Sequence, residues 1–303
     1  MITLSVVIPT YNPDLNRLNQ TLTALQSQTL DINFWELHII DNNSSNGFIK
    51  HIDVSFQPNT SILHEPRQGL TYARLKGFAA VKGSIIVMVD DDNILAPGYL
   101  QSVLNIFRIN PKLGAAGGKS LPLFEVEPPV WLPEFYSNLA LRNLGEQVIF
   151  KDWQHEYPAS APIGAGMAIR KEALRSYLDK AASGKNLISD RTGNSLTSGG
   201  DNDIVLEVLK SGWQVGYFPE LVLQHIIPAQ RMQVHYLARL VNNTNRSWVQ
   251  LLNRHGISPW QPLTRLGAAI RKVKAYFTQK AWQSKVAYIK WQGACGMYDG
   301  LVK

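Results

Sequence analysis

The sequence predicts an α/β protein built on a doubly wound, mostly parallel β-sheet with helices on both faces. Short runs of apolar and β-branched residues alternate with segments whose apolar residues recur every three or four positions. The connections between those runs are long enough for the crossover helices that parallel strands require. A chain of 303 residues with 45% hydrophobic and 17% charged residues is an ordinary globular chain that can bury a large core.

Four strands and three helices are expected in the first half of the chain. The strands are LSVVI, WELHII, SILH and SIIVMV. Asn12 and Pro13 are typical of the N-cap and first turn of the first helix. The second helix is expected over 70–81, and the third follows Pro97.

The second half begins with an irregular stretch, 121–162, rich in proline and aromatic residues, which is typical of a lid or a binding surface. A short strand and a helix from about Lys171 follow. The polar segment 182–200 is expected to be mobile. A helix over 203–210, the stretch WQVGYFPELVLQH and a helical tail complete the chain.

The N-terminus and the cysteine content indicate a cytosolic chain. MITLSVVIPTYN has no basic leading region and is interrupted by Pro9, so it is interpreted as a first strand and not as a signal peptide. The sequence has no apolar run long enough to span a membrane. Cys295 is the only cysteine, which excludes an internal disulfide and a cysteine-based metal site.

The net charge of +7 comes from the tail, because residues 265–303 contain eight Lys or Arg and one acid, Asp299. One helical stripe there is apolar and consists of Leu266, Ile270, Val273 and Phe277. Three basic residues fall off that stripe: Arg271, Lys272 and Lys274. The pattern fits a basic amphipathic helix on an anionic membrane, and it equally fits a helix packed on the domain with its charges in solvent.

Polar segments follow the expected strands, at the sheet edge where open α/β folds bind ligands: PTYN, DNNSS, EPRQG and DDDN. Three adjacent carboxylates repel one another unless a cation, solvent or hydrogen bonds neutralise them. Asp90 and Asp92 point the same way on an extended chain, and such oxygen ligands suit Mg²⁺ or Mn²⁺ bridging to phosphates. A turn at DNNSS and a helix cap at DDDN are the alternatives.

The motifs VVIPTYN, DNNSS, GLTYARLKGFAAVKGSIIVMVDDDN, GAGMAIRK and GGDNDIVLEVLKSGWQVGYFPELVLQH, in that order, resemble a family 2 glycosyltransferase of the Rossmann-like GT-A fold. The resemblance covers about Leu4 to Arg231. It implies a GT-A catalytic domain over 1–230, with a nucleotide-binding half at 1–120 and an acceptor-binding half at 121–230. Residues 231–303 form a helical, basic extension.

The activity implied by the resemblance is inverting transfer of a hexosyl group from a nucleotide sugar, a UDP-sugar above all. The acceptor is a hydroxyl of a glycan or lipid-linked molecule in polysaccharide or surface-glycan biosynthesis. A divalent Mg²⁺ or Mn²⁺ is the implied cofactor. From the cysteine content and the basic tail, and not from the resemblance, we expect a cytoplasmic location with peripheral association through the tail at the inner face of the plasma membrane, and no nucleic acid partner.

The resemblance also implies roles for the nucleotide-binding residues. Asp41 recognises the nucleotide base, and three residues of the first motif form the wall around it: Pro9, Thr10 and Tyr11. Asp90 contacts ribose or a metal-bound water, and Asp92 ligates the metal. Arg74 of YAR lies near the nucleotide, or is a solvated helix residue.

Asp201 matches the catalytic base, although Gly200 stands where the family usually has Glu. A slipped alignment would put Asn202 on the base, but the helical register of the following apolar residues favours Asp201. A helix N-cap is the alternative for Asp201. His225, after the last strand, is either a further metal ligand or a structural histidine.

Trp131, Trp153 and Gly166 are assigned to the acceptor side, where the tryptophans could stack on a sugar ring or pack the loop onto the core. Three other functions are alternatives. A sugar-phosphate nucleotidyltransferase would need a basic, glycine-rich loop where PTYNPD stands. A non-catalytic sugar-nucleotide or carbohydrate-binding module would explain Gly200. Nucleic-acid binding through the tail conflicts with the acid-lined sheet edge.

Overall fold

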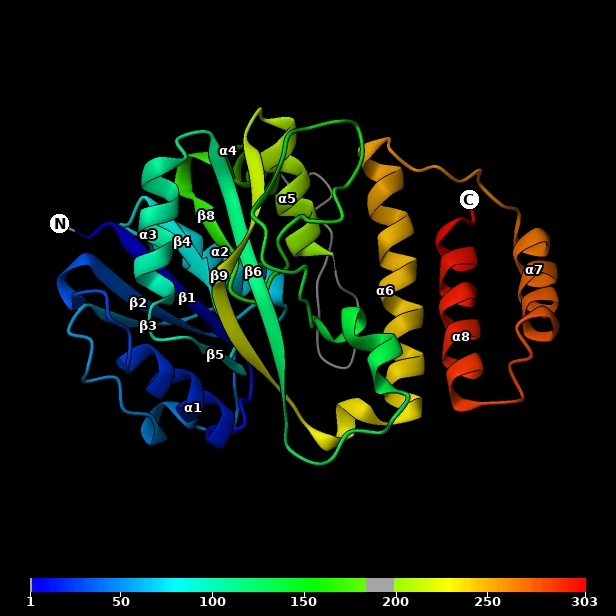
Figure 1. Cartoon of the computed structure of the whole chain (residues 1–303), viewed down its shortest axis with the longest axis horizontal. Coiled ribbons are helices and arrows are strands. Elements are labelled where there is room, and N and C mark those ends of the chain that lie inside the picture. The colour runs from blue at the N-terminus through cyan, green and yellow to red at the C-terminus, as the bar shows by residue number, and fades with distance from the viewer. Residues whose placement is uncertain (1, 184–198) are drawn as a thin grey trace. The chain divides into compact units, whose positions relative to one another are not determined.

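A computed structural model describes residues 2–183 and 199–303 of the chain. Among these residues nine strands form one sheet in the order β3-β2-β1-β4-β8-β6-β9-β5, and β7 pairs with β9 (Figure 1). The chain divides into two compact units. The described part of unit 1 comprises 2–123, 140–183 and 201–226, and that of unit 2 comprises 124–139, 199–200 and 227–303.

The parallel part of the sheet contains the four strands expected from the sequence. They are β1 (Leu4–Thr10), β2 (Trp35–Asp41), β3 (Thr60–His64) and β4 (Ile85–Met88). β1 pairs in parallel with β2 and β4, and β2 pairs in parallel with β3. Every residue of β1, β2 and β4 is buried, as expected for parallel strands covered on both faces. β4 is a continuous apolar run, whereas β1 includes the buried Ser5 and β2 the buried Glu36 and His38.

An antiparallel part extends the sheet beyond β4. It consists of β5 (Asn93–Leu95), β6 (Leu113–Phe124), β7 (Ile149–Lys151), β8 (Ala168–Arg170) and β9 (Gln214–Ile227). β8 runs antiparallel to β4 and β6, and β9 runs antiparallel to β5 and β7. The sequence did not predict β5, β6 or β7. β6 carries glycines because a Cβ on Gly118 would lie only 2.0 Å from the carbonyl oxygen of Leu221.

Helices cover both faces of the sheet, as expected. α1 (Leu15–Gln26) and α3 (Tyr99–Ile109) share one apolar cluster with Val6 of β1. α2 (Leu70–Ala80), α4 (Arg175–Ala182) and α5 (Gly200–Lys210) share a second cluster with Val7. Neighbouring residues of β1 therefore serve opposite layers, as a strand buried on both sides requires.

The expected N-cap of the first helix was wrong. Asp14 caps α1 by accepting hydrogen bonds from the backbone N–H groups of Asn16 and Arg17. Asn12 has a left-handed φ of 46°, and its side-chain oxygen accepts from the N–H groups of Ser45 and Asn46. Asn12 thus ties the loop after β1 to the loop after β2.

Two other expectations about the loops need correction. α3 has Gly98 at its N-cap with no side-chain cap, so DDDN does not cap that helix. The stretch 121–162 is only partly irregular, because it includes the end of β6, a 3-10 helix η3 (Leu132–Leu139) and β7. Most of the segment 182–200, expected to be mobile, lies outside the described residues.

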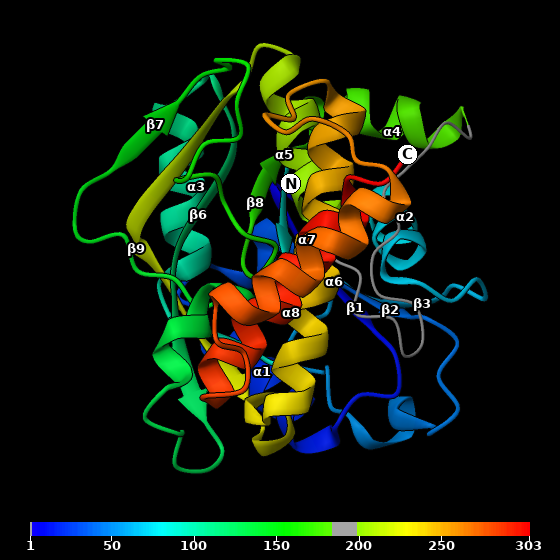
Figure 2. The ribbon, with the colours of Figure 1, turned by 90° about the vertical axis from the view of Figure 1, so that its right-hand side faces the viewer.

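Unit 2 contains the helical tail. It includes the 3-10 helix η5 (Ala229–Met232) and the helices α6 (Val234–His255), α7 (Arg265–Thr278) and α8 (Lys285–Gly300). α8 packs between α6 and α7 (Figures 1 and 2). Gly296 of α8 allows the close approach to α6, because a Cβ there would lie 1.9 Å from the carbonyl oxygen of Asn242.

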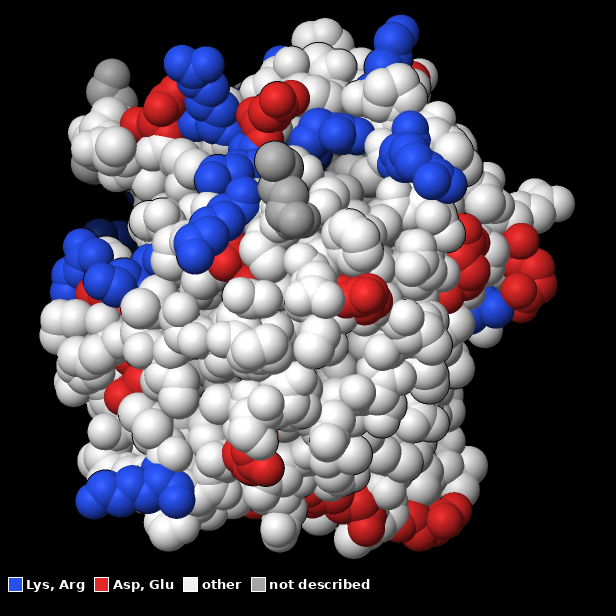
Figure 3. All heavy atoms as spheres, turned by 90° about the vertical axis from the view of Figure 1, so that its left-hand side faces the viewer, with Lys and Arg blue, Asp and Glu red and all other residues white. Residues whose placement is uncertain are grey.

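Figure 3 shows the charged side chains on one face of the molecule. On the face shown in Figure 3, most Lys and Arg side chains lie in the upper half among acidic ones, and the lower half has acidic side chains along its bottom edge and few basic ones. In the described part of the chain, no helix is both long and apolar enough to cross a bilayer.

Candidate active site

The carboxyl ends of the three outer parallel strands bring Thr10, Asp41 and His64 side by side, because they are register partners. The carboxylate of Asp41 is mostly buried and is fixed from two sides. Its Oδ1 accepts a hydrogen bond from the backbone N–H of Ser44 at 2.8 Å, and its Oδ2 lies 3.3 Å from Nδ1 of His64. This edge therefore presents an oriented carboxylate, that of Asp41.

The aspartate triplet follows β4 at the same edge. Thr10 donates its hydroxyl to the carboxylate of Asp91, which links the ends of β1 and β4. Asn93 donates to Oδ1 of Asp92 at 3.1 Å and accepts from the backbone N–H of Asp90 at 3.1 Å. Asp90 and Asp91 are half-buried, while Asp92 is buried. Hydrogen bonds thus hold the carboxylates of Asp91 and Asp92 and the backbone of Asp90.

Asp92 and His225, both predicted as metal ligands, are brought together. Asn93 of β5 pairs with His225 of β9 in the antiparallel register, and the backbone N–H of Ile226 donates to the carbonyl of Asp92. Nε2 of His225 lies 3.4 Å from Oδ1 of Asp92, and both side chains are buried. A carboxylate oxygen and an imidazole nitrogen form a donor pair that suits Mn²⁺ or Mg²⁺.

Asp201 and Arg74 converge on Gly164. Oδ2 of Asp201 accepts a hydrogen bond from the backbone N–H of Gly164 at 2.9 Å. A Cβ on Gly164 would lie 3.0 Å from that oxygen and 3.2 Å from Nη2 of Arg74. Arg74 is only 5% exposed, so the alternative of a solvated helix residue is wrong. A carboxylate and a guanidinium are therefore held beside the same backbone turn.

Asp201 and Asn202 are neighbours in the first turn of α5, but their side chains have different partners. The helix begins at Gly200, so Asp201 lies inside its first turn and accepts from a residue outside the helix. Oδ1 of Asn202 accepts from the hydroxyl of Tyr157 at 2.7 Å. Burial raises the pKa of Tyr157, and the nearby charge of Asp201 raises it further, so this phenol stays protonated.

Asn42 was missed by the sequence interpretation, which assigned a role only to Asp41 within DNNSS. Its buried amide donates to the carbonyls of Glu65 and Arg67 at 3.1 and 2.7 Å and accepts from the N–H of Gly69 at 2.7 Å. Glu65 in turn binds Arg67 through two nitrogens at 2.8 and 3.1 Å, and these bonds lower the pKa of Glu65. Asn42 therefore fixes the EPRQG loop ahead of α2.

The predicted acceptor residues differ in their surroundings. Gly166 has a left-handed φ of 73°, its carbonyl accepts from the hydroxyl of Tyr99 at 2.6 Å, and a Cβ would lie 2.5 Å from Leu223. Trp153 packs against the second core cluster, with Nζ of Lys210 5.5 Å from its ring centroid. Trp131 belongs to unit 2, where it forms an edge-to-face contact with Phe135.

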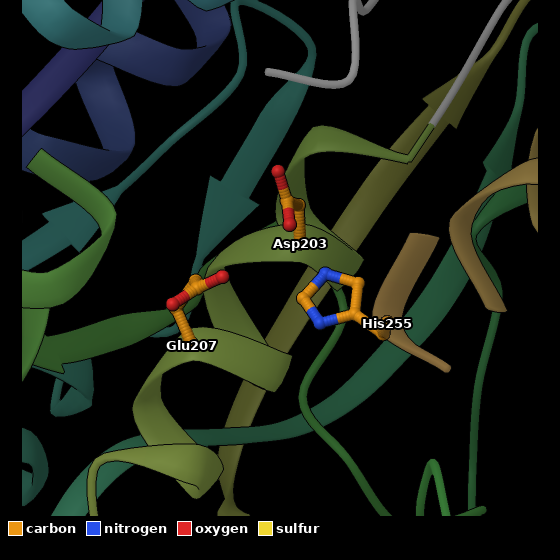
Figure 4. A group of neighbouring side chains, drawn as sticks. All are labelled: Asp203, Glu207 and His255. Carbon is orange, nitrogen blue, oxygen red and sulfur yellow. The ribbon is translucent and has the colours of Figure 1, made fainter. Parts of the chain in front are cut away.

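A second pair of carboxylates, Asp203 and Glu207, lies one turn apart on α5 (Figure 4). Nζ of Lys180 is 2.9 Å from an oxygen of each, and these hydrogen bonds outweigh burial and raise the pKa of Lys180. Within unit 1 this network joins α4 to α5. His255, also labelled in Figure 4, belongs to unit 2.

Residues 5–178, more than half of the chain, match the model of glycosyl transferase family 2. The chain belongs to this family. Among curated relatives of this family 2 chain is a glucosyl-dolichyl phosphate glucuronosyltransferase of Haloferax volcanii, 27% identical over 137 residues, which are 44% of this chain and 43% of the relative. An N-acetylglucosaminyltransferase of Mesorhizobium japonicum is 24% identical over 236 residues, 74% of this chain and 51% of the relative. The matched segments thus span about half the length of these relatives.

Solved structures support the fold of this family 2 chain. The mannosyltransferase PcManGT of Pyrobaculum calidifontis, in complex with GDP-Man and Mn²⁺, has a TM-score of 0.62 and 13% identity over 97% of this chain and 85% of that one. Residues 1–349 of S. aureus TarS, in complex with UDP-GlcNAc, give a TM-score of 0.57 and 10% identity over 98% of this chain and 90% of that one. The GT-A fold expected from the sequence is confirmed.

Proposed function

We propose that the chain is a metal-dependent, inverting glycosyltransferase that moves a hexosyl group from a nucleotide sugar, a UDP-sugar above all, to an acceptor hydroxyl. The observation that carries the proposal is the contact between Asp92 and His225 at 3.4 Å. Two residues far apart in the sequence meet at the strand edge where α/β sheets bind nucleotides. The family to which the chain belongs supports the same activity.

A divalent cation fits the residues of this edge. Asp92 and His225 would hold it, with Asp90 close by in the chain, since carboxylate oxygen and neutral imidazole are its usual ligands. The cation would supply neutralisation of the charge that develops on the diphosphate leaving group. The Mn²⁺ named with the Pyrobaculum mannosyltransferase supports Mn²⁺ as the first metal to test.

Nucleotide recognition is assigned to the outer strands. Asp41, oriented by Ser44 and His64, would accept hydrogen bonds from the nucleotide base, and Pro9, Thr10 and Tyr11 would border it. Tyr11 follows β1 and is 44% exposed, so its ring is available to a ligand. The buried guanidinium of Arg74 would bind a phosphate oxygen.

Asp201 is proposed as the general base. It removes the proton of the acceptor hydroxyl while that oxygen bonds to the anomeric carbon and the bond from carbon to the diphosphate oxygen breaks. The proton ends on Asp201, the electron pair leaves with the nucleoside diphosphate, and the configuration inverts. The hydrogen bond from Gly164 orients the carboxylate for this step, and the missing Glu at Gly200 does not remove it.

We also propose a lipid-linked or glycan acceptor, a role in polysaccharide or surface-glycan synthesis and a cytoplasmic location at the membrane. The name of the Haloferax relative, which includes dolichyl phosphate, supports a lipid-linked acceptor. Trp131 and Trp153 remain the proposed acceptor-binding side chains. The lack of a spanning helix among the described residues is compatible with peripheral association.

The first test is a calorimetric donor panel. UDP-GlcNAc and GDP-mannose, the donors named with the solved structures, and dTDP-glucose are titrated into the protein with Mn²⁺ or Mg²⁺, and then with EDTA. We expect one nucleotide class to bind, and EDTA to weaken binding at least tenfold. Release of nucleoside diphosphate then measures turnover.

Two variants locate the metal. Asp92→Ala and His225→Gln should each lose the metal-dependent part of donor binding, while Asp53→Ala, an exposed aspartate of unit 1, should bind as the wild type does. Metal-independent binding in both variants and in wild type would contradict the metal site. Donor binding without any turnover would favour the non-catalytic module.

A further inference from the structure

α7 has its large apolar side chains on its outer face. Leu266, Ile270, Val273 and Phe277 are 59–72% exposed, although they form one helical stripe. The residues that α7 buries are small ones, Ala268 and Ala275. An amphipathic helix in a globular protein normally buries its large apolar stripe, so this orientation is the reverse of the usual one.

Specific contacts within unit 2 hold α7 in that orientation. Nε1 of Trp291 on α8 donates to the carbonyl of Lys272 at 3.0 Å, and the ring of Trp291 lies edge-on to Tyr276 with centroids 5.1 Å apart. Lys272 also pairs with Asp299 of α8. These partners occupy the side of α7 that faces α8, so the apolar stripe is presented outward.

Aromatic residues extend the apolar face beyond the end of the helix. Trp282 is 54% exposed and lies 5.9 Å, centroid to centroid, from the ring of Phe277. Tryptophan at the edge of an apolar patch suits the boundary between lipid headgroups and acyl chains, because its ring is apolar and its N–H is polar.

The charges around the stripe decide between possible occupants. Arg265, Arg271, Lys274 and Lys280 are exposed on α7 or directly after it. The single acid of 265–303, Asp299, is already paired with Lys272. Two copies of the chain packed through this face would bring like charges together, whereas lipid phosphates would complement them.

We propose that the outer face of α7, with Trp282, docks on an anionic phospholipid surface. The apolar side chains would enter the boundary between headgroups and acyl chains, and the basic side chains would bind lipid phosphates. The proposal does not depend on which sugar the chain transfers, and it would stand even if the chain bound no nucleotide sugar.

Vesicle co-sedimentation of the whole chain tests the proposal. We expect binding to mixed phosphatidylcholine and phosphatidylglycerol vesicles, weak binding to phosphatidylcholine alone, and a decrease with added salt. The double variant Ile270→Ser/Phe277→Ser should lower the partition coefficient at least about tenfold, because each side chain loses its apolar burial. Lys274→Gln should lower it about fivefold.

A matched control separates this face from general surface hydrophobicity. Val126 and Val130 are exposed apolar residues of unit 2 outside the tail, and Val126→Ser/Val130→Ser should bind vesicles as the wild type does. Equal binding by wild type and by Ile270→Ser/Phe277→Ser would overturn the proposal, as would an equal loss in the control variant.

Two further measurements cover the other outcomes. Self-association in sedimentation velocity that is abolished by Ile270→Ser/Phe277→Ser, without vesicle binding by wild type, would show that the face joins two copies and would overturn the proposal. Nucleotide-sugar titration of the same variant should match wild type. Lost vesicle binding with intact donor binding therefore separates failure of docking from failure of the proposed enzyme.

Discussion

Replacing Asp201 with asparagine is the sharpest test of the catalytic assignment. Oδ2 of Asp201 accepts from the backbone N–H of Gly164 at 2.9 Å, and the side-chain oxygen of asparagine can accept the same hydrogen bond. The variant therefore keeps the size and the anchor of the side chain and loses its ability to take up a proton. A positioned general base contributes about 10²–10⁴ in rate, so we expect kcat to fall by that factor, or by roughly 3–5 kcal/mol.

The assay follows release of nucleoside diphosphate from the donor found in the titration panel. The dissociation constant of the donor should stay within about threefold of wild type, because a general base stabilises the transition state and does not contribute to donor binding. Asn202→Ala is the matched neighbour. Its oxygen accepts from Tyr157, and we expect less than about a tenfold loss of kcat, well below the effect of removing a base. A kcat above one tenth of wild type in Asp201→Asn, with loss in Asn202→Ala, would refute the assignment.

Three predictions concern stability. Gly166→Ala places a Cβ 2.5 Å from Leu223 at a φ of 73° and should cost about 2–4 kcal/mol in the free energy of unfolding. Gly98→Ala, with open space around it, is the control and should cost less than about 1 kcal/mol. Urea melts compare the two variants, and equal midpoints would contradict the packing argument. Gly296→Ala meets the carbonyl oxygen of Asn242 at 1.9 Å and should lower the melting temperature in calorimetry by several degrees, about the effect of 1–3 kcal/mol, unless α8 can shift freely. Burial raises the pKa of Glu36, but hydrogen bonds from Ser5 and Lys82, both at 2.6 Å, outweigh it and lower the pKa below 4.5. The charged form of Glu36 therefore stabilises the fold above pH 4.5, and this effect is lost as the pH falls through the folded pKa. Glu36→Gln should lower the free energy of unfolding by about 1–3 kcal/mol at neutral pH and by less in acid. A loss of stability that does not change with pH would contradict this prediction.

The parallel half of the sheet could be predicted because its physics is local. Largely apolar runs such as those of β1 and β4 are favourable only when both faces are covered, and the crossover helices between parallel strands follow from the direction of the strands. The same reasoning places the polar residues at the strand ends, including Asp41 and Asp92, at one edge of the sheet.

The antiparallel half could not be predicted, because its strands depend on distant partners. β5 has only three residues, and β6 contains glycines that by propensity disfavour a strand. The meeting of Asp92 with His225 depends on the pairing of β5 with β9, so neither residue alone signals it. Asn42 was missed because only burial distinguishes its bonded amide from that of an ordinary turn residue.

The tail shows the limit of a helical pattern. The sequence identified the apolar stripe of α7, but the pattern alone does not say which side packs. The contacts of Ala268, Ala275 and Trp291 decide it, because they hold the small side of the helix toward α8. The structure therefore places the apolar stripe on the exposed side of α7 and the small residues toward α8.

Unit 2 is assembled from pieces of chain that are not contiguous. η3 (Leu132–Leu139) belongs with the C-terminal helices and packs against α6, and its buried residues include Leu132 and Phe135. Trimming the chain after β9 would remove α6 and leave the buried side chains of η3 without that partner. The tail therefore does not form a unit separate from the rest of the chain, and its function has to be studied by substitutions on its surface and not by truncation.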